Sequence, residues 1–162
     1  MKRSSTLFLK VVILLIAIGA LAGMIRFPQT EGRAANLDLI SIYGDPFILY
    51  LYVASIPFYV ALYQAIKLLG CVEKNTIFSE TAVKVVGNIK YCAIAVVSFI
   101  AAAVSYIFVM AKVAATNDDP AGFVAIGLVV IFASAVIATA AAVFQTLLQN
   151  ALDIKSENDL TV

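Results

Sequence analysis

Four long apolar runs, each nearly free of Asp, Glu, Lys and Arg, dominate this sequence. A helix needs about 20 apolar residues to cross a hydrocarbon core about 30 Å thick, and each run reaches this length. We therefore predict an all-α integral membrane protein that forms a four-helix bundle. The predicted spans are residues 7–26, 46–69, 90–111 and 121–148.

The composition supports the same class of protein. Of the 162 residues, 63% are hydrophobic and 13% are charged, which is more apolar material than a soluble domain of this size can bury. The four spans use most of the chain, so we predict a single membrane domain without a separate soluble enzyme. The remaining segments are an outer loop at 27–45, a cytoplasmic loop at 70–89 and a cytoplasmic tail at 149–162.

The distribution of Lys and Arg predicts the orientation, because cytoplasmic segments carry an excess of these residues close to the span ends. One face holds the larger group, Lys2, Arg3, Lys10, Lys67, Lys74, Lys84, Lys90 and Lys155. The opposite face holds Arg26, Arg33 and Lys112. We therefore predict that both termini are cytoplasmic and that the protein lies in a bacterial cytoplasmic (inner) membrane. The near-neutral net charge of +1 gives no indication of direct nucleic-acid binding.

The first span has an alternative interpretation as a cleaved signal peptide. Lys2 and Arg3 precede its apolar stretch, and Ala20-Leu21-Ala22 forms a small-x-small site. We predict that the span is retained. Cleavage would leave the orientation of the later spans unchanged.

Local signals refine the second, third and fourth helices. Pro57 lies in the middle of the second span, where it predicts a kink. Ser79 is placed to cap the third helix, which therefore begins well before its membrane span. The fourth apolar run is longer than the hydrocarbon core, and the polar residues Gln145, Gln149 and Asn150 predict that its helix emerges from the membrane.

The sequence provides no set of catalytic groups. It contains no His, and its carboxylates all fall in predicted loops or tails, so we predict no enzyme activity, no cofactor and no metal site. Asp118 and Asp119 could bind a cation, but a helix-bounding turn explains them more simply. Cys71 and Cys92 are expected near a reducing face, so no disulfide is predicted.

The second span carries a polar and aromatic stripe on one side. Its members recur at helical spacing and are Tyr52, Ser55, Tyr59 and Tyr63. Such a stripe can line a ligand groove, and this is our candidate binding site. The alternative is that the stripe forms interhelical hydrogen bonds and an interfacial aromatic belt.

Small residues at four-residue spacing mark the first, third and fourth spans, as at Gly19 and Gly23. Surfaces of this kind let helices approach closely. They predict packing within the bundle, and a homo-oligomer formed through the same faces is the alternative.

The cytoplasmic side offers a candidate surface for a soluble partner. Exposed groups are expected at the start of the third helix and in the tail, next to a run that contains Val83, Val85 and Val86. The candidate residues are Phe78, Lys84, Asn88, Glu157, Asn158 and Asp159. Helix caps, a solvated helix face and a frayed tail are the alternative explanation.

Several segments resemble the bacterial domain of unknown function 2975 (DUF2975) family of small four-span membrane proteins. They are Asn75–Glu80, Asn88–Cys92, Asp118–Gly122, Leu147–Ala151 and Lys155–Thr161. The resemblance covers essentially the whole chain. It implies no activity and no catalytic residues, since none is established for the family. Members are often encoded beside a small helix-turn-helix regulator, which implies a membrane partner for a cytoplasmic transcription factor.

We therefore expect a non-enzymatic sensor, or membrane partner, of a cytoplasmic helix-turn-helix regulator. The alternative from another class is a small exporter or a membrane-stress or peptide protection protein that acts as a homodimer, with the tyrosine stripe as its substrate groove.

Overall fold

A computed structural model describes residues 3–30, 46–113 and 121–160. Four helices make up most of this part of the chain: α1 (Arg3–Thr30), α3 (Pro46–Glu73), α4 (Glu80–Val113) and α5 (Ala121–Leu160). Asp118 and Asp119 lie outside the described residues, as does most of the predicted outer loop.

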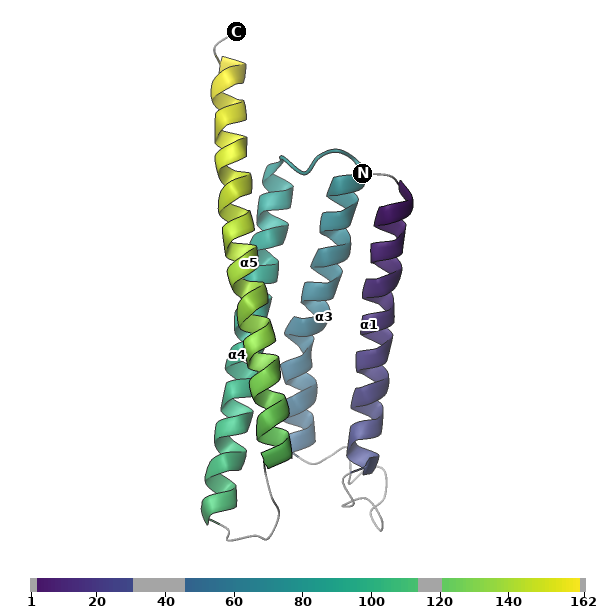
Figure 1. Cartoon of the computed structure of the whole chain (residues 1–162), viewed down its shortest axis with the longest axis vertical. Helices are drawn as coiled ribbons and strands as arrows, with labels where there is room; N and C mark the ends of the chain where they lie inside the picture. The colour runs from purple at the N-terminus through teal and green to yellow at the C-terminus, as the bar shows by residue number, and fades with distance from the viewer. Residues whose placement is uncertain (1–2, 31–45, 114–120, 161–162) are drawn as a thin grey trace.

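All four helices are long and apolar enough to cross a membrane, and the described residues contain no strand. The predicted all-α, four-span membrane fold is therefore confirmed. The helices continue past the apolar runs: α4 has 34 residues and α5 has 40. At 1.5 Å per residue, α5 is about 60 Å long, twice the thickness of the hydrocarbon core. Its last turns project beyond the ends of the other helices (Figure 1). The residues from 149 onward are called the stalk below.

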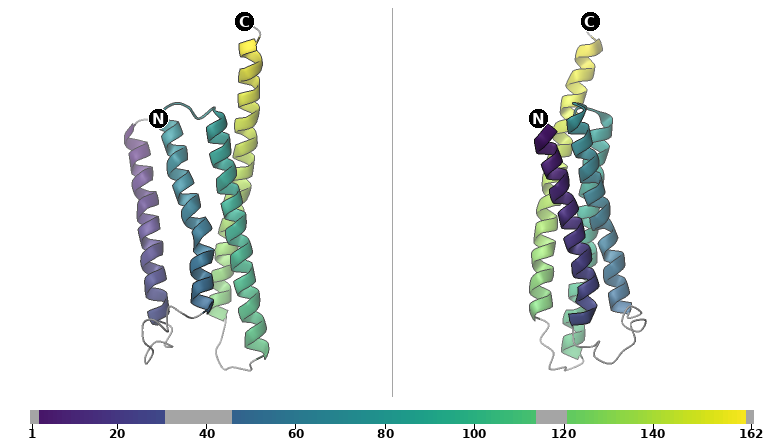
Figure 2. Two further views of the ribbon diagram at one scale, coloured as in Figure 1. Left: turned by 180° about the vertical axis from the view of Figure 1, so that it is seen from behind. Right: turned by 90° about the vertical axis from the view of Figure 1, so that its right-hand side faces the viewer.

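The helices form an open bundle rather than a closed one. The most extensive packing is between α4 and α5, the next is between α3 and α4, and α1 packs mainly along α3. Seen from two further directions, α1, α3 and α4 follow one another side by side and α5 crosses over α4 (Figure 2). The first turn of α1 and the last turn of α5 lie toward the same end of the bundle (Figure 1). This end is called the terminal end below.

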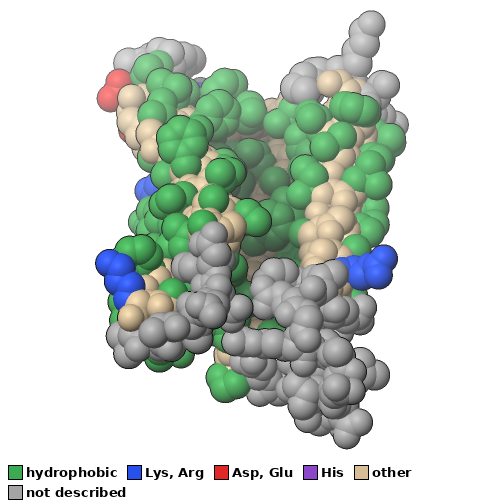
Figure 3. Space-filling view, turned by 60° about the horizontal axis from the view of Figure 1, so that its bottom comes forward, with side chains coloured by type: hydrophobic (Ala, Val, Ile, Leu, Met, Phe, Trp, Pro, Cys, Tyr) green, Lys and Arg blue, Asp and Glu red, His purple; other side chains and the backbone are tan. Residues whose placement is uncertain are grey.

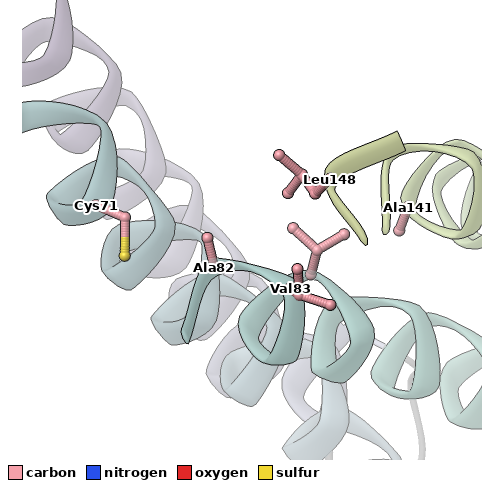
Figure 4. Packing of buried hydrophobic residues seen from close by; sticks show 6 residues of the cluster. Cys71, Ala82, Val83, Ala141 and Leu148 are labelled. Carbon is pink, nitrogen blue, oxygen red and sulfur yellow. The ribbon is translucent and has the colours of Figure 1, made fainter. Parts of the chain in front are cut away.

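The best-buried side chains gather near the terminal end. A cluster joins α3, α4 and α5, and its buried members are Cys71, Ala82, Val83, Val86, Ala141 and Leu148. Figure 4 shows Leu148 of α5 above Val83 of α4, with Ala82 beside them. Val85 and Val86 are only 3% and 2% exposed, so the valines at the start of α4 pack inside the bundle and add nothing to its outer surface.

The connection between α3 and α4 is a short turn with a defined hydrogen-bond pattern. The backbone N–H of Thr76 donates to the Cys71 carbonyl at 2.9 Å, and that of Asn75 donates to the Val72 carbonyl at 3.2 Å. This pair of bonds is a Schellman motif, in which the residue just after the end of the helix adopts a left-handed conformation. Asn75 adopts that conformation with a φ of 55°, and Asn tolerates it better than most residues that carry a side chain.

The predicted Ser79 cap of the next helix is confirmed. The backbone N–H of Ala82 donates to Ser79 Oγ at 3.3 Å, and Ser79 Oγ donates to the Thr76 carbonyl at 2.7 Å. The cap satisfies one of the free N–H groups at the start of α4. A Schellman motif followed directly by a capped start fixes where α3 ends and α4 begins.

Two glycines allow α4 and α5 to approach closely. A Cβ added to Gly87 of α4 would lie 2.8 Å from Nε2 of Gln145 on α5. A Cβ added to Gly127 of α5 would overlap Cγ2 of Val104 on α4. Val is stiff at χ1, so the Val104 methyl cannot easily move aside. The spacing of the two helices therefore depends on Gly127, whereas the atoms of Gln145 beside Gly87 are the end of a flexible side chain.

Replacing Gly127 with Ala tests this dependence. We expect Gly127→Ala to lower the free energy of unfolding by about 1–3 kcal/mol, the usual effect of an extra methyl group in a packed interface. Thermal unfolding in detergent, followed by circular dichroism, measures the change.

The matched control is Gly122→Ala on the same helix, where an added Cβ meets nothing within 4 Å. Its stability should stay the same or rise, because Ala favours a helix more than Gly does. Equal losses in the two variants would show that the Val104 contact does not determine the spacing of α4 and α5.

Candidate functional site

A groove of about 620 Å³ lies between the helices, and all four contribute to its wall. Figure 3 shows a hollow with hydrophobic walls when the end of the bundle opposite the terminal end is brought forward. Lining residues include Gly23 and Met24 of α1, Tyr52 and Ala54 of α3, Ile100 of α4, and Gly127 of α5. This space is called the lateral groove below.

The groove occupies only part of the bundle's length. Along α3 its wall runs from Ile48 to Phe58, which is about 15 Å at 1.5 Å per residue. That length is close to half of a hydrocarbon core about 30 Å thick. On α5 the wall runs from Phe123 to Val130, in the first turns of the helix. The lateral groove therefore belongs to the half of the bundle farther from the termini.

Two members of the predicted stripe, Tyr52 and Ser55, line the lateral groove. The Tyr52 hydroxyl donates to the Met24 carbonyl of α1 at 3.2 Å, and Ser55 Oγ donates to the Tyr52 carbonyl at 2.7 Å. Both interpretations of the stripe therefore hold for Tyr52 and Ser55. Their side chains border a ligand-sized space, and their hydroxyl groups donate hydrogen bonds to backbone carbonyls of the protein.

The other two members lie elsewhere. Tyr59 points to α1, where its hydroxyl is 3.8 Å from Sδ of Met24, and it does not line the groove. Tyr63 is 62% exposed on the outside of the bundle. Residues 52, 59 and 63 lie close to one face of α3, because seven and eleven residues are nearly whole numbers of helical turns. The groove wall on α3 ends at Phe58, so the last two of these residues lie beyond the groove, toward the terminal end. That Tyr59 and Tyr63 take part in binding a ligand stays a prediction.

Sequence reasoning missed the walls that α1 and α5 contribute. Gly19 and Gly23 were interpreted as packing residues, but an added Cβ at either position meets nothing within 4 Å. Gly23 instead borders the lateral groove, and its lack of a side chain leaves this part of the groove open. A glycine flanked by apolar residues in a span was the only signal, and it does not distinguish close packing from open space.

The candidate partner residues at the start of α4 and in the turn before it are exposed at the terminal end. Phe78 is 55% exposed, and Lys84 forms a solvent-exposed ion pair with Glu80 at 3.6 Å. Asn88 is exposed one turn further along α4. An exposed ion pair of this kind contributes little to stability, so Lys84 remains available for other contacts.

The candidate residues of the tail lie farther out. Glu157 is exposed on the stalk, and the side chains of Asn158 and Asp159 lie outside the described residues. Leu148 packs against the start of α4, and Glu157 follows nine residues later in the same helix, about 13 Å farther along its axis. The structure therefore does not bring the α4 residues and the tail residues of the predicted surface together, because they lie at different levels along the bundle axis.

Polar contacts join the helices near the terminal end. Lys10 Nζ of α1 lies 2.7 Å from a carboxylate oxygen of Glu73 at the end of α3. Lys90 Nζ of α4 donates to Oε1 of Gln145 on α5 at 2.8 Å. These contacts tie α1 to α3 and α4 to α5, at the end of the bundle opposite the lateral groove.

The hydrogen bond from Tyr52 to Met24 can be tested by removing one hydroxyl. We expect Tyr52→Phe to lower the free energy of unfolding by about 1 kcal/mol, because the Met24 carbonyl loses a donor between two helices. The matched change Tyr63→Phe, at an exposed position, should have no effect. Equilibrium unfolding in mixed micelles distinguishes the variants, and equal results would mean that the bond does not hold α1 against α3.

Comparison with known proteins agrees with this fold. A model of a family described as protein of unknown function (DUF2975) matches residues 11–162. The chain is 49% identical over 164 residues, covering all of both chains, to the uncharacterised membrane protein YoaS of Bacillus subtilis (strain 168). No solved structure matches. The resemblance noted in the sequence is therefore confirmed, and the chain is a four-helix membrane protein that belongs to the DUF2975 family.

Proposed function

We propose that this chain is a non-enzymatic sensor in a bacterial cytoplasmic membrane, which passes a signal from within the bilayer to a helix-turn-helix regulator in the cytoplasm. The observation that carries the proposal is the continuity of α5. One unbroken helix of 40 residues forms part of the wall of the lateral groove at its start and the stalk at its end.

The packing of α5 supports this role. Gly127 lies in the wall of the groove and also sets the spacing to Val104 of α4. Near the other end of the bundle, Gln145 is held by Lys90 and sits over Gly87. An occupant that fits one spacing of α4 and α5 better than another would shift the population of the two arrangements. Because α5 is a single helix, such a shift would move the stalk.

The last turns of α5, from Leu147 into the stalk, offer an apolar stripe to a partner. Leu147 and Ile154 are 59% and 62% exposed, and Ala151 lies between them at helical spacing. Ile154 projects beyond the cluster in which Leu148 packs against α4. An apolar stripe on a helix that extends into water is typical of a surface that docks in a groove of another protein. The charged residues Lys155 and Glu157 flank the stripe.

The proposal requires the stalk to be cytoplasmic, which cysteine labelling tests. In a background with Cys71→Ala and Cys92→Ala, we expect Lys112→Cys to react with a membrane-impermeant maleimide in intact cells. Lys84→Cys should react only after permeabilisation, because the excess of Lys and Arg lies on its side of the membrane. The reverse labelling pattern would place the stalk on the outer side of the membrane, and the proposal would then be wrong.

A pull-down from the protein's own cells tests the partner. We expect the detergent-solubilised chain to capture a DNA-binding regulator. The double variant Leu147→Ser, Ile154→Ser should capture at least about tenfold less, since each buried apolar side chain contributes about 1.5–3 kcal/mol.

The control is Gln149→Ala, Ser156→Ala, which changes the opposite face of the same helix and should capture as much regulator as the unmodified chain. If no regulator is captured, and deletion of residues 156–162 leaves the transcriptome unchanged, the proposal is wrong. Capture of only a second copy of the chain through Leu147 and Ile154 would also overturn it, because the stalk would then be a contact between copies.

A further inference from the structure

We propose that the lateral groove binds one acyl chain of an anionic phospholipid from the leaflet opposite the terminal end, with the lipid phosphate beside Arg26. The inference deepens the proposed function by naming the class of signal that the groove reads. The binding itself depends on neither the regulator nor the stalk.

The chemistry of the wall selects a hydrocarbon chain. Of the lining residues, only Tyr52 and Ser55 have polar side chains, and their hydroxyl protons are donated to backbone carbonyls of the protein. A ligand that carried polar groups into the groove would give up hydrogen bonds to water without replacing them, and this disfavours its binding. An acyl chain gives up none.

The dimensions of the groove fit one leaflet. Its wall on α3 spans about 15 Å, the depth that the chains of a single leaflet occupy in a core about 30 Å thick. Between the outermost helices, α1 and α5, there is no extensive packing like that between α4 and α5. The hollow is open when viewed from this end (Figure 3). A lipid chain can therefore enter sideways from the bilayer.

The charge at this end of α1 matches an anionic head group. Arg26 is exposed in the last turns of α1, less than one turn beyond the level of Met24 in the groove wall, and its side chain leaves a different side of the helix from that of Met24. Lys112 at the corresponding end of α4 is also exposed. Lys and Arg side chains are visible on both sides of the molecule in this view (Figure 3). Each such cation near the membrane surface favours an anionic lipid by roughly fivefold.

Gly23 provides a clean way to block the groove. It borders the space, and a Cβ built there meets nothing within 4 Å, so the backbone position has room for the side chain that Gly23→Leu adds to the groove wall. Gly19 lies one turn away on the same helix, has equally open surroundings and does not line the groove. Gly19→Leu is therefore a matched control for any effect of a larger side chain on α1.

The absence of Trp from the sequence makes a site-specific fluorescence test possible. Phe123→Trp places a single reporter in the groove wall, and Phe132→Trp places one at an outer position that is 73% exposed. The full-length variants are reconstituted into phosphatidylethanolamine vesicles that contain a minor fraction of phosphatidylglycerol or phosphatidylcholine brominated on the acyl chain. Quenching of the Trp fluorescence reports contact with a brominated chain.

We expect brominated phosphatidylglycerol to quench the Phe123→Trp reporter at roughly fivefold lower concentration than brominated phosphatidylcholine does. Adding Arg26→Gln should remove this preference, and adding Gly23→Leu should remove most of the quenching. Adding Gly19→Leu should change neither. The Phe132→Trp reporter should be quenched in all of these backgrounds, with little preference between the two lipids.

Equal quenching by both lipids that Arg26→Gln leaves unchanged would overturn the head-group assignment. If the Phe123→Trp reporter is still quenched after Gly23→Leu is added, the proposal that an acyl chain occupies the groove is wrong. Quenching that appears only as the protein is diluted into excess lipid would show that a second copy covers the groove instead. None of these results depends on capture of a regulator, so failure here and failure of the proposed function are separate observations.

Discussion

The close approach of α4 and α5 is the constraint on which the rest of the arrangement depends. Lipid supplies no hydrophobic force between helices, so their association relies on close packing and hydrogen bonds. Gly87 and Gly127 make room for Gln145 and Val104 at two levels of this interface. With α5 fixed on α4, and α1 packed along α3, the two outermost helices leave a space that neither fills. The lateral groove is therefore a consequence of how the helices pair.

Much of the fold could be predicted from the sequence, because the bilayer limits a spanning chain to a few structures. Length and hydropathy were enough for the four helices, and local hydrogen-bonding chemistry was enough for the Ser79 cap. The emergence of the last helix followed from its length and from the polar residues near Gln149. These features depend on one segment at a time, so they require no knowledge of how segments pack.

The candidate site depends on packing between segments, and here the sequence was a weaker guide. In a soluble helix the apolar face shows which side turns inward, but in a membrane lipid and protein neighbours are both apolar. Tyr52 and Tyr63 lie near the same face of α3 and differ in their level along the helix, so their spacing does not show which of them borders the groove. Because lipid and protein neighbours are both apolar, the spacing of Gly19 and Gly23 predicts helix packing, although Gly23 borders the groove. Val86 lies next to predicted surface residues in the sequence, and its burial depends on Ala141 and Leu148 of α5, which are distant along the chain.

The peripheral position of α1 bears on how the chain is assembled. No residue in its most apolar stretch is fully buried inside the bundle, and its described contacts are mainly with α3. A helix of this kind satisfies its own backbone hydrogen bonds and is stable in lipid before any partner is present. During synthesis α1 is therefore stable in the bilayer before its neighbours are made. It packs against α3 once α3 has been inserted and Glu73 can pair with Lys10. Of the three extensive helix interfaces, the one between α1 and α3 is therefore the first that the growing chain can form, before α4 and α5 are made.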